Sequence, residues 1–138
     1  MTSSEPALAD IEEEWSELAP LLEALIRRSP RFGLSLSEVR CDCLNEEADL
    51  WKAPEGYLVT KFIRDPVSQE KTLFMWIACA KNPGVDMGTK YLSFFDEVAK
   101  YTGCRYIELW SSRAGMGRYL APHGFSLFYR SFRRTIDG

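Results

Sequence analysis

The sequence predicts a single mixed α/β domain in which helices flank a central sheet. Three consecutive features of its second half indicate this. Residues 72–80 (TLFMWIACA) are apolar on both faces, as a central strand is. A glycine-bearing loop follows, and residues 92–99 then carry apolar side chains at helical spacing. Residues 104–110 (CRYIELW) read as a second strand, which completes a strand–helix–strand unit of the kind that joins parallel neighbours.

The N-terminal part predicts a helix that begins after Asp10. Asp10 is a suitable N-cap, and the three glutamates that follow suit the helix dipole. Apolar residues recur at helical spacing until Ser29-Pro30, where the helix should end. Pro20 interrupts the pattern and predicts either a kink or two abutting helices. Residues 1–9 are polar, and we expect them to be loose.

A second helix and a pair of strands follow. Ser35 and Glu38 have capping-box spacing, which predicts a helix over 36–46. A strand over 39–43 (VRCDC) is the competing interpretation. The strand candidates are 48–53 (ADLWKA) and 57–65 (YLVTKFIRD), with a Pro-Glu-Gly turn between them.

The remaining elements are predicted from turn and cap residues. Asp65-Pro66 and the polar residues after it indicate a hairpin turn that leads into the central strand. Gly103 is placed for a helix C-cap. A short helix over 113–120 and a final strand over 125–135 are predicted to close the chain.

Composition limits the class of protein. With 138 residues, 46% of them apolar, the chain fits one domain, 1–138, with a substantial core. No apolar run approaches the roughly 20 residues that span a bilayer. The acidic N-terminus lacks a signal-peptide layout. We therefore expect no membrane contact and a cytoplasmic location.

Cysteine and histidine usage argues against a metal site. The four cysteines form no CxxC pair, and His123 is the single histidine, so we expect no bound metal. The cysteines are expected to be buried thiols. His123 stands between Pro122 and Gly124, where a solvent-facing turn histidine is the simplest interpretation.

The charge is divided unevenly. The net charge is −3, but residues 1–70 carry 15 acids against 7 bases and residues 71–138 carry 5 acids against 10 bases. The basic half holds the glycine-bearing loop. It is either an ordinary solvated surface or a surface that attracts an anionic, nucleotide-bearing cofactor. The overall acidity argues against a nucleic-acid partner, for which the terminal run RSFRR is the main support.

From Trp76 onward the chain resembles the GNAT superfamily of acyl-CoA-dependent N-acyltransferases. The residues that carry the resemblance are the strand ending at Ala80, the loop reaching Gly88, the helix ending EVAKYTGC, and the segments IELWSS and RAGMGRYLAPHGF. It covers residues 72–136, whereas residues 10–70 fit only in the order of elements. The pattern looks closest to small phage-encoded GNAT-like proteins, a resemblance that implies the host cytosol as the location, with virion association as an alternative.

The resemblance implies a cofactor, acetyl-CoA or another acyl-CoA, whose pyrophosphate sits on backbone amides of the loop. Gly88 aligns with the last glycine of the family pattern. Asp86 falls where the first glycine belongs, and Pro83 falls where the family has Gln or Arg. An acid and a proline are the opposite of the bare, positive backbone that such a site needs. The implied cofactor-binding residues are Ala80, Lys81, Gly84, Met87, Gly88, Thr89 and Lys90.

The resemblance also implies two catalytic groups. Glu108 is the best candidate for the base that deprotonates the amine, and Tyr119 for the acid that protonates the thiolate. Leu120 occupies the usual tyrosine position, so Tyr119 is one residue, about 100° of helix rotation, away from it. The alternatives are an ion-paired surface carboxylate for Glu108 and a packing residue for Tyr119.

Two classes of function follow. One is an acyltransferase that acts on an amine or a protein substrate, with the acyl-CoA arm between strands that part near Ala80 and Trp110. The other is a catalytically inert GNAT-like phage protein that binds a host or virion protein. The altered loop and the aromatic residues near the C-terminus favour the second class.

Overall fold

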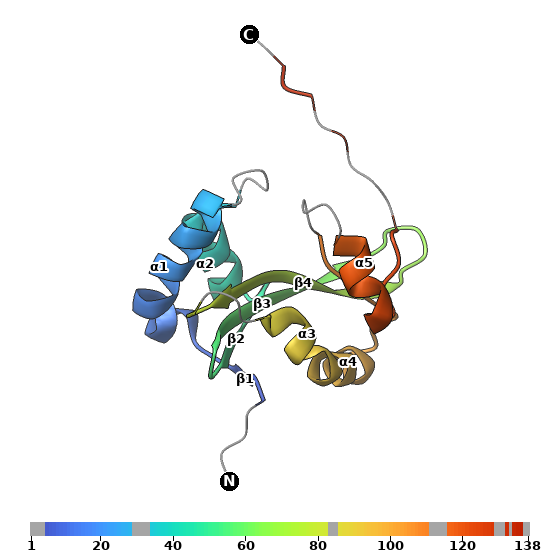
Figure 1. Ribbon diagram of the computed structural model, residues 1–138, viewed down its shortest axis with the longest axis horizontal. Coiled ribbons are helices and arrows are strands. Elements are labelled where there is room, and N and C mark those ends of the chain that lie inside the picture. The colour runs from blue at the N-terminus through green and yellow to red at the C-terminus, as the bar shows by residue number, and fades with distance from the viewer. Residues whose placement is uncertain are drawn as a thin grey trace.

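The computed structural model describes residues 5–28, 34–82, 86–110, 116–128, 132 and 134–136 (Figure 1). Its centre is a five-stranded sheet in the order β1-β2-β3-β4-β5. Neighbouring strands are antiparallel except for β4 and β5, which are parallel. The strands are β1 (Ala7–Leu8), β2 (Asp49–Ala53), β3 (Gly56–Arg64), β4 (Lys71–Ala80) and β5 (Tyr106–Glu108). The predicted mixed α/β fold is confirmed.

Two helices cover one face of the sheet (Figure 1). Helix α1 (Ile11–Arg28) begins after Asp10, whose carboxylate accepts a hydrogen bond from the Glu12 amide at 2.8 Å. It runs through Pro20 as one helix, so the two-helix alternative is wrong. Helix α2 (Leu36–Leu44) begins as predicted, because the Ser35 hydroxyl accepts from the Glu38 amide at 3.2 Å. The competing strand over 39–43 is wrong.

The opposite face carries α3 (Met87–Lys90) and α4 (Leu92–Tyr101). After α4 the chain turns at Gly103, which has φ +78°, a conformation that glycine adopts without strain. It then enters β5. The short helices α5 (Met116–Leu120) and η2 (Ala121–His123) follow, and residues 113–115 of the predicted short helix lie outside the described residues.

The sheet separates two apolar clusters, one on each face. Beneath α1 and α2 lie buried side chains that include Leu18, Val39 and Val59. Beneath α3 and α4 lie others that include Trp51, Leu73 and Phe95. The indole of Trp51 is fixed by a buried hydrogen bond from its Nε1 to the Thr60 hydroxyl at 2.9 Å. Both faces of β4 are therefore covered, as its apolar sequence predicts.

Two predictions at the chain ends are wrong. Residues 7–8 are not loose: they form β1 by pairing with Trp51 and Lys52 of β2. The predicted final strand over 125–135 is absent from its described part, because residues 125–128, 132, 134 and 135 belong to no strand. A strand needs a partner with free backbone groups, and β5 offers an edge of only three residues.

Gly56 provides a test of how β3 is held against β4. It has φ +156°, and a Cβ atom there would overlap the backbone carbonyl oxygen of Cys79. We expect Gly56→Ala to lower the free energy of unfolding by about 3 kcal/mol or more, measured by urea denaturation. The matched control is Gly117→Ala in α5, where a Cβ meets nothing within 4 Å. That substitution should be neutral or stabilising by about 0.5–1 kcal/mol. Equal effects of the two substitutions would contradict this account.

Candidate functional site

The parallel strands β4 and β5 pair over only three positions. Thr72, Leu73 and Phe74 lie opposite Tyr106, Ile107 and Glu108. Beyond this point β5 ends, whereas β4 continues to Ala80. The pairing of the two strands therefore stops before the carboxyl end of β4, the edge at which open α/β sheets bind ligands. The predicted connection, a parallel crossover through a helical segment near residue 89, is present.

The helix start at this edge is capped by the protein's own carboxylate. Asp86 accepts a hydrogen bond from the Thr89 amide at 3.3 Å and another from the Thr89 hydroxyl. A cap of this kind satisfies a backbone donor that an anionic ligand would otherwise use. Met87 is buried in the cluster under α4, so its side chain belongs to the core. Gly84 and Pro83 lie outside the described residues.

Of the two lysines that flank the loop, Lys90 has its ammonium engaged in an ion pair, and Lys81 is held by its backbone amide. The ammonium of Lys90 forms an ion pair with Glu55, a residue of the turn between β2 and β3. Glu55 also accepts a hydrogen bond from the Tyr91 hydroxyl, and its backbone carbonyl accepts from the Lys81 amide at 2.7 Å. Glu55 thus ties the β2–β3 turn to both sides of the predicted cofactor loop. It also neutralises the positive charge that Lys90 would offer to a pyrophosphate.

Tyr119 of α5 reaches this loop. Its hydroxyl lies 3.3 Å from the Thr89 hydroxyl, so the structure brings the predicted acid next to one predicted cofactor-binding residue. The His123 ring lies 6.1 Å from the Tyr119 ring, and His123 is exposed in the turn that follows. Asp86, Thr89 and Tyr119 form a chain of polar contacts at the edge where the strands part.

Glu108 lies at the end of β5, half-buried. Its carboxylate accepts a hydrogen bond from Trp110 Nε1 at 2.8 Å, and the Trp110 ring packs on Phe74 with centroids 4.6 Å apart. Ile107 packs under α4, so strand alternation directs Glu108 to the opposite face of the sheet. Within the described residues no direct contact joins Glu108 to Tyr119. The two candidates thus lie on different elements, Glu108 beside Trp110 and Tyr119 beside Thr89.

Sequence reasoning missed two carboxylates. Glu55 lies 35 positions before Lys90, and Glu17 accepts a hydrogen bond at 3.0 Å from Tyr57, 40 positions later. Tyr57 is buried, and burial together with this bond raises the pKa of its hydroxyl above the ordinary range. Separations of this size leave no local signal, although the turn residues around Glu55 marked its position.

The four cysteines differ in exposure. Burial raises the pKa of Cys79 to about 12 and that of Cys43 to about 11. Cys41 is exposed, so the expectation of a buried thiol is wrong for that residue. In the described part of the chain, no group of three or more His, Cys, Asp or Glu side chains is placed to hold a metal ion. None of the described helices is long and apolar enough to cross a membrane.

Solved structures provide the comparison. The chain superposes on an acetyltransferase of Trypanosoma brucei with a TM-score of 0.65 at 17% identity, covering 96% of this chain and 99% of that one. For an aminoglycoside acetyltransferase from an uncultured soil metagenomic sample, in complex with sisomicin, the TM-score is 0.64 at 14% identity and 96% of both chains is covered. The chain has a GNAT-like fold. A possible acetyltransferase from Clostridium difficile 630 is similar too, with a TM-score of 0.70, 10% identity and coverage of 97% and 98%.

These likenesses are structural. No family model and no curated protein sequence matches the chain. At identities of 10–17% the comparisons support the fold and leave the activity to be argued from the site.

The Asp86 cap leads to a stability prediction. Asp86→Ala removes the acceptor of the Thr89 amide and should lower the free energy of unfolding by about 1 kcal/mol, measured by urea denaturation. Asp86→Asn keeps a capping oxygen and should lose much less. If both variants unfold like the parent protein, the cap does not contribute to stability.

Proposed function

We propose that the protein is an acyl-CoA-dependent N-acyltransferase. The observation that carries this proposal is the parting of the parallel strands β4 and β5 after Phe74 and Glu108. In this proposal an extended thioester arm lies beside the part of β4 that has no β5 partner. When bound, the acyl-CoA supplies an activated acyl group, and the amine displaces the thiolate.

Each candidate residue has a role set by its position. Glu108, on the face opposite α4, would accept the proton that the amine loses as the new C–N bond forms. Tyr119, beside Thr89, would donate a proton to the sulfur as the C–S bond breaks. The proton donor Tyr119 and the proton acceptor Glu108 would thus act from opposite faces of the sheet.

The described loop residues fit the arm of the cofactor better than its pyrophosphate. The Asp86 carboxylate already accepts the hydrogen bond of the Thr89 amide, and the Glu55 carboxylate already pairs with the Lys90 ammonium. A bound pyrophosphate would have to displace the Asp86 carboxylate or lie beside it. The repulsion is on the order of 1 kcal/mol at near-surface distances. This predicts weak cofactor binding by the natural sequence.

We therefore expect Asp86→Asn to bind CoA more tightly, by about fivefold, in isothermal titration calorimetry, because 1.4 kcal/mol corresponds to a factor of ten. The substitution removes the charge and keeps the cap. Asp96→Asn on the exposed side of α4 is the matched control and should not change the affinity. No heat for either the natural protein or Asp86→Asn at millimolar CoA would exclude the proposed cofactor site.

Turnover tests the two catalytic assignments. With acetyl-CoA and a panel of primary amines, followed by mass spectrometry of the acylated product, we expect Tyr119→Phe and Glu108→Gln each to lower kcat by about 10²-fold or more. Tyr106→Phe, an exposed tyrosine of β5, should retain full activity. If both variants kept the parent rate, other residues would carry the chemistry.

A second candidate is an inert GNAT-like protein of phage origin that binds a host or virion protein. The internal pairing of Asp86 with Thr89 and of Glu55 with Lys90 favours it, because these groups are satisfied without any cofactor. Its signature would be the absence of CoA binding and turnover in both the natural protein and Asp86→Asn. Measurable acylation of any amine would count against it.

A further inference from the structure

A groove lies between α4 and strands β1 to β3, and Lys90 and Tyr91 line its end beside the predicted cofactor loop. Its volume is about 900 Å³. One wall is the α4 stripe of Phe94, Val98 and Tyr101, and the floor includes Trp51 and Phe62. The ring of Trp51 meets that of Phe94 edge-on, with centroids 5.5 Å apart. The groove thus has an aromatic wall and floor, with charged residues that include Glu5, Asp49 and Glu97 in its lining.

Asp49 places a half-buried carboxylate in the groove. It lines the groove, and strand alternation places it on the same face as Trp51. Burial and the nearby Glu46 raise the pKa of its carboxyl group. Among the described residues no hydrogen bond or ion pair reaches the Asp49 side chain, whereas Glu97 is paired with Lys100 at 3.4 Å and Lys90 with Glu55. A half-buried carboxylate without a cation favours a cationic ligand.

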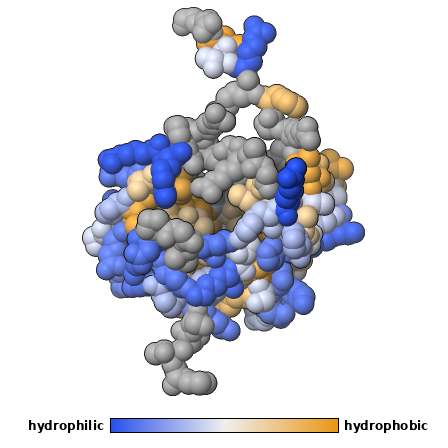
Figure 2. Space-filling view, in the orientation of Figure 1, coloured by the Kyte–Doolittle hydropathy of each residue, from blue (hydrophilic) through white to orange (hydrophobic). Residues whose placement is uncertain are grey.

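The C-terminal segment has the complementary chemistry. Residues 125–136 contain three arginines (Arg130, Arg133 and Arg134) and no acidic residue. Three of its apolar side chains are largely exposed: Leu127 by 71%, Phe132 by 89% and Ile136 by 80%. Figure 2 shows hydrophobic residues on the part of this segment that extends away from the body of the protein.

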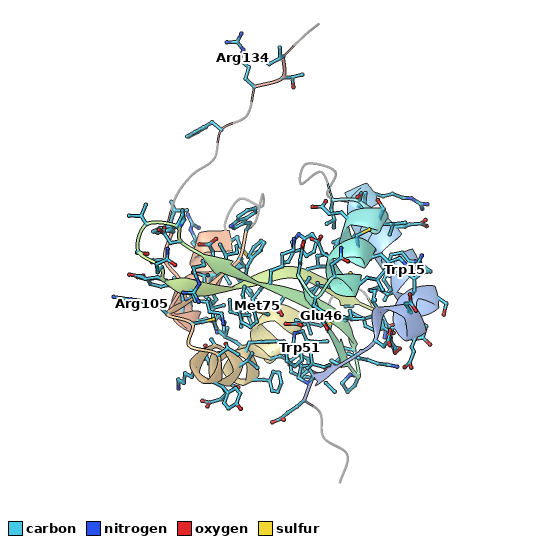
Figure 3. All side chains as sticks on the ribbon, turned by 180° about the vertical axis from the view of Figure 1, so that it is seen from behind. Trp15, Glu46, Trp51, Met75, Arg105 and Arg134 are labelled. Atoms are coloured by element: carbon cyan, nitrogen blue, oxygen red, sulfur yellow. The ribbon has the colours of Figure 1, made fainter. Side chains whose placement is uncertain are left out.

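The groove and the segment do not meet within one chain. Figure 3 shows Arg134 far above the sheet, whereas Trp51 lies on the opposite side of the molecule. Figure 1 likewise places α4 and β1 at the end of the molecule away from the C-terminus. A second copy of the chain can bring the two surfaces together.

We propose that the groove between α4 and β1 to β3 receives the C-terminal segment of a second copy of this chain. An arginine of the segment pairs with Asp49, and its aromatic side chains pack on Trp51 and Phe94. Reciprocal exchange gives a closed two-fold dimer, in which each copy contributes one groove and one segment. The contacts that carry this proposal, Asp49, Trp51 and Phe94, are not among the candidate acyl-CoA residues.

The size of the two surfaces is adequate. A volume of about 900 Å³ is near the upper end of the roughly 300–1,000 Å³ range of ligand pockets, so it can accommodate several side chains of the segment. Exchange doubles the contact, because two grooves are filled at once. Aromatic and arginine anchors in a preformed groove are the usual centre of a binding surface.

Sedimentation velocity over about 1–100 µM protein tests the proposal, a range that brackets micromolar association. We expect the natural chain to form dimers, and a chain truncated after Gly124 to stay monomeric. Asp49→Arg, and separately the triple variant Arg130→Glu, Arg133→Glu, Arg134→Glu, should each weaken dimerisation at least about tenfold, the usual effect of losing a close charge pair. Glu38→Arg on α2, on the other face, should dimerise like the natural chain.

Mixing the two variants separates docking from misfolding. The natural segment of the Asp49→Arg chain fits the natural groove of the triple variant, and the acidic segment of the triple variant fits the basic groove of the Asp49→Arg chain. We therefore expect the mixture to form a heterodimer although neither variant dimerises alone. A natural chain that is monomeric throughout, or a mixture that fails to associate, would overturn the proposal. If the segment bound the groove of its own chain, or bound nucleic acid instead, the natural chain would stay monomeric throughout.

Discussion

The three-position parallel contact between β4 and β5 is the constraint on which the rest of the site depends. A parallel pair requires the connecting chain to cross over one face of the sheet, so α3 and α4 must pack there. Met87 and Phe95 hold this crossover by burial against Leu73 and Trp51. Thr89 is therefore fixed at the strand ends by core packing. Because the pairing stops at Phe74, the same contact that positions the loop also leaves the sheet open beside it.

The polar groups around that opening are satisfied by one another. Glu55 joins the β2–β3 turn to Lys90 and Tyr91, and Asp86 closes the start of α3. Such pairing has two consequences. It holds the loop in one conformation, and it makes an incoming anion compete with a carboxylate that belongs to the protein. The strands and the loop therefore bear differently on the proposed cofactor: part of β4 has no β5 partner, whereas the charge of Asp86 disfavours a phosphate at the start of α3.

The sequence predicted an element correctly where the residues that determine it lie close to it in the chain. The starts of α1 and α2 were predictable because Asp10 and Ser35 lie within three residues of the amides they cap. The hairpins were predictable because their turn residues adjoin the strands. The two-residue β1 was missed, since Ala7 and Leu8 are too few to show alternation and depend on the edge of β2. The predicted final strand does not form in the described part of residues 125–135, because propensity does not supply a pairing partner.

The catalytic and cofactor candidates show the same limit. The resemblance selected Thr89 and Tyr119, whose hydroxyl groups are in contact. Tyr119 lies one residue from the usual tyrosine position, and the sequence alone does not show where its hydroxyl then points. The link from Glu55 to Lys90 had no sequence signal, because 35 residues separate the partners and each is an ordinary surface residue in sequence terms.

The C-terminal segment is better suited to binding in a groove than to pairing as an additional strand of the sheet. Both edge strands are short, two residues in β1 and three in β5, and short edges are a common protection against unwanted strand pairing. A segment with exposed Phe132 and Ile136 must bury these side chains by contact with other side chains instead. On the α3 and α4 face, α4 is the main helix over a sheet that extends beyond it, and the uncovered part is lined by Trp51 and Phe62. The aromatic groove is thus the surface that matches the segment in chemistry.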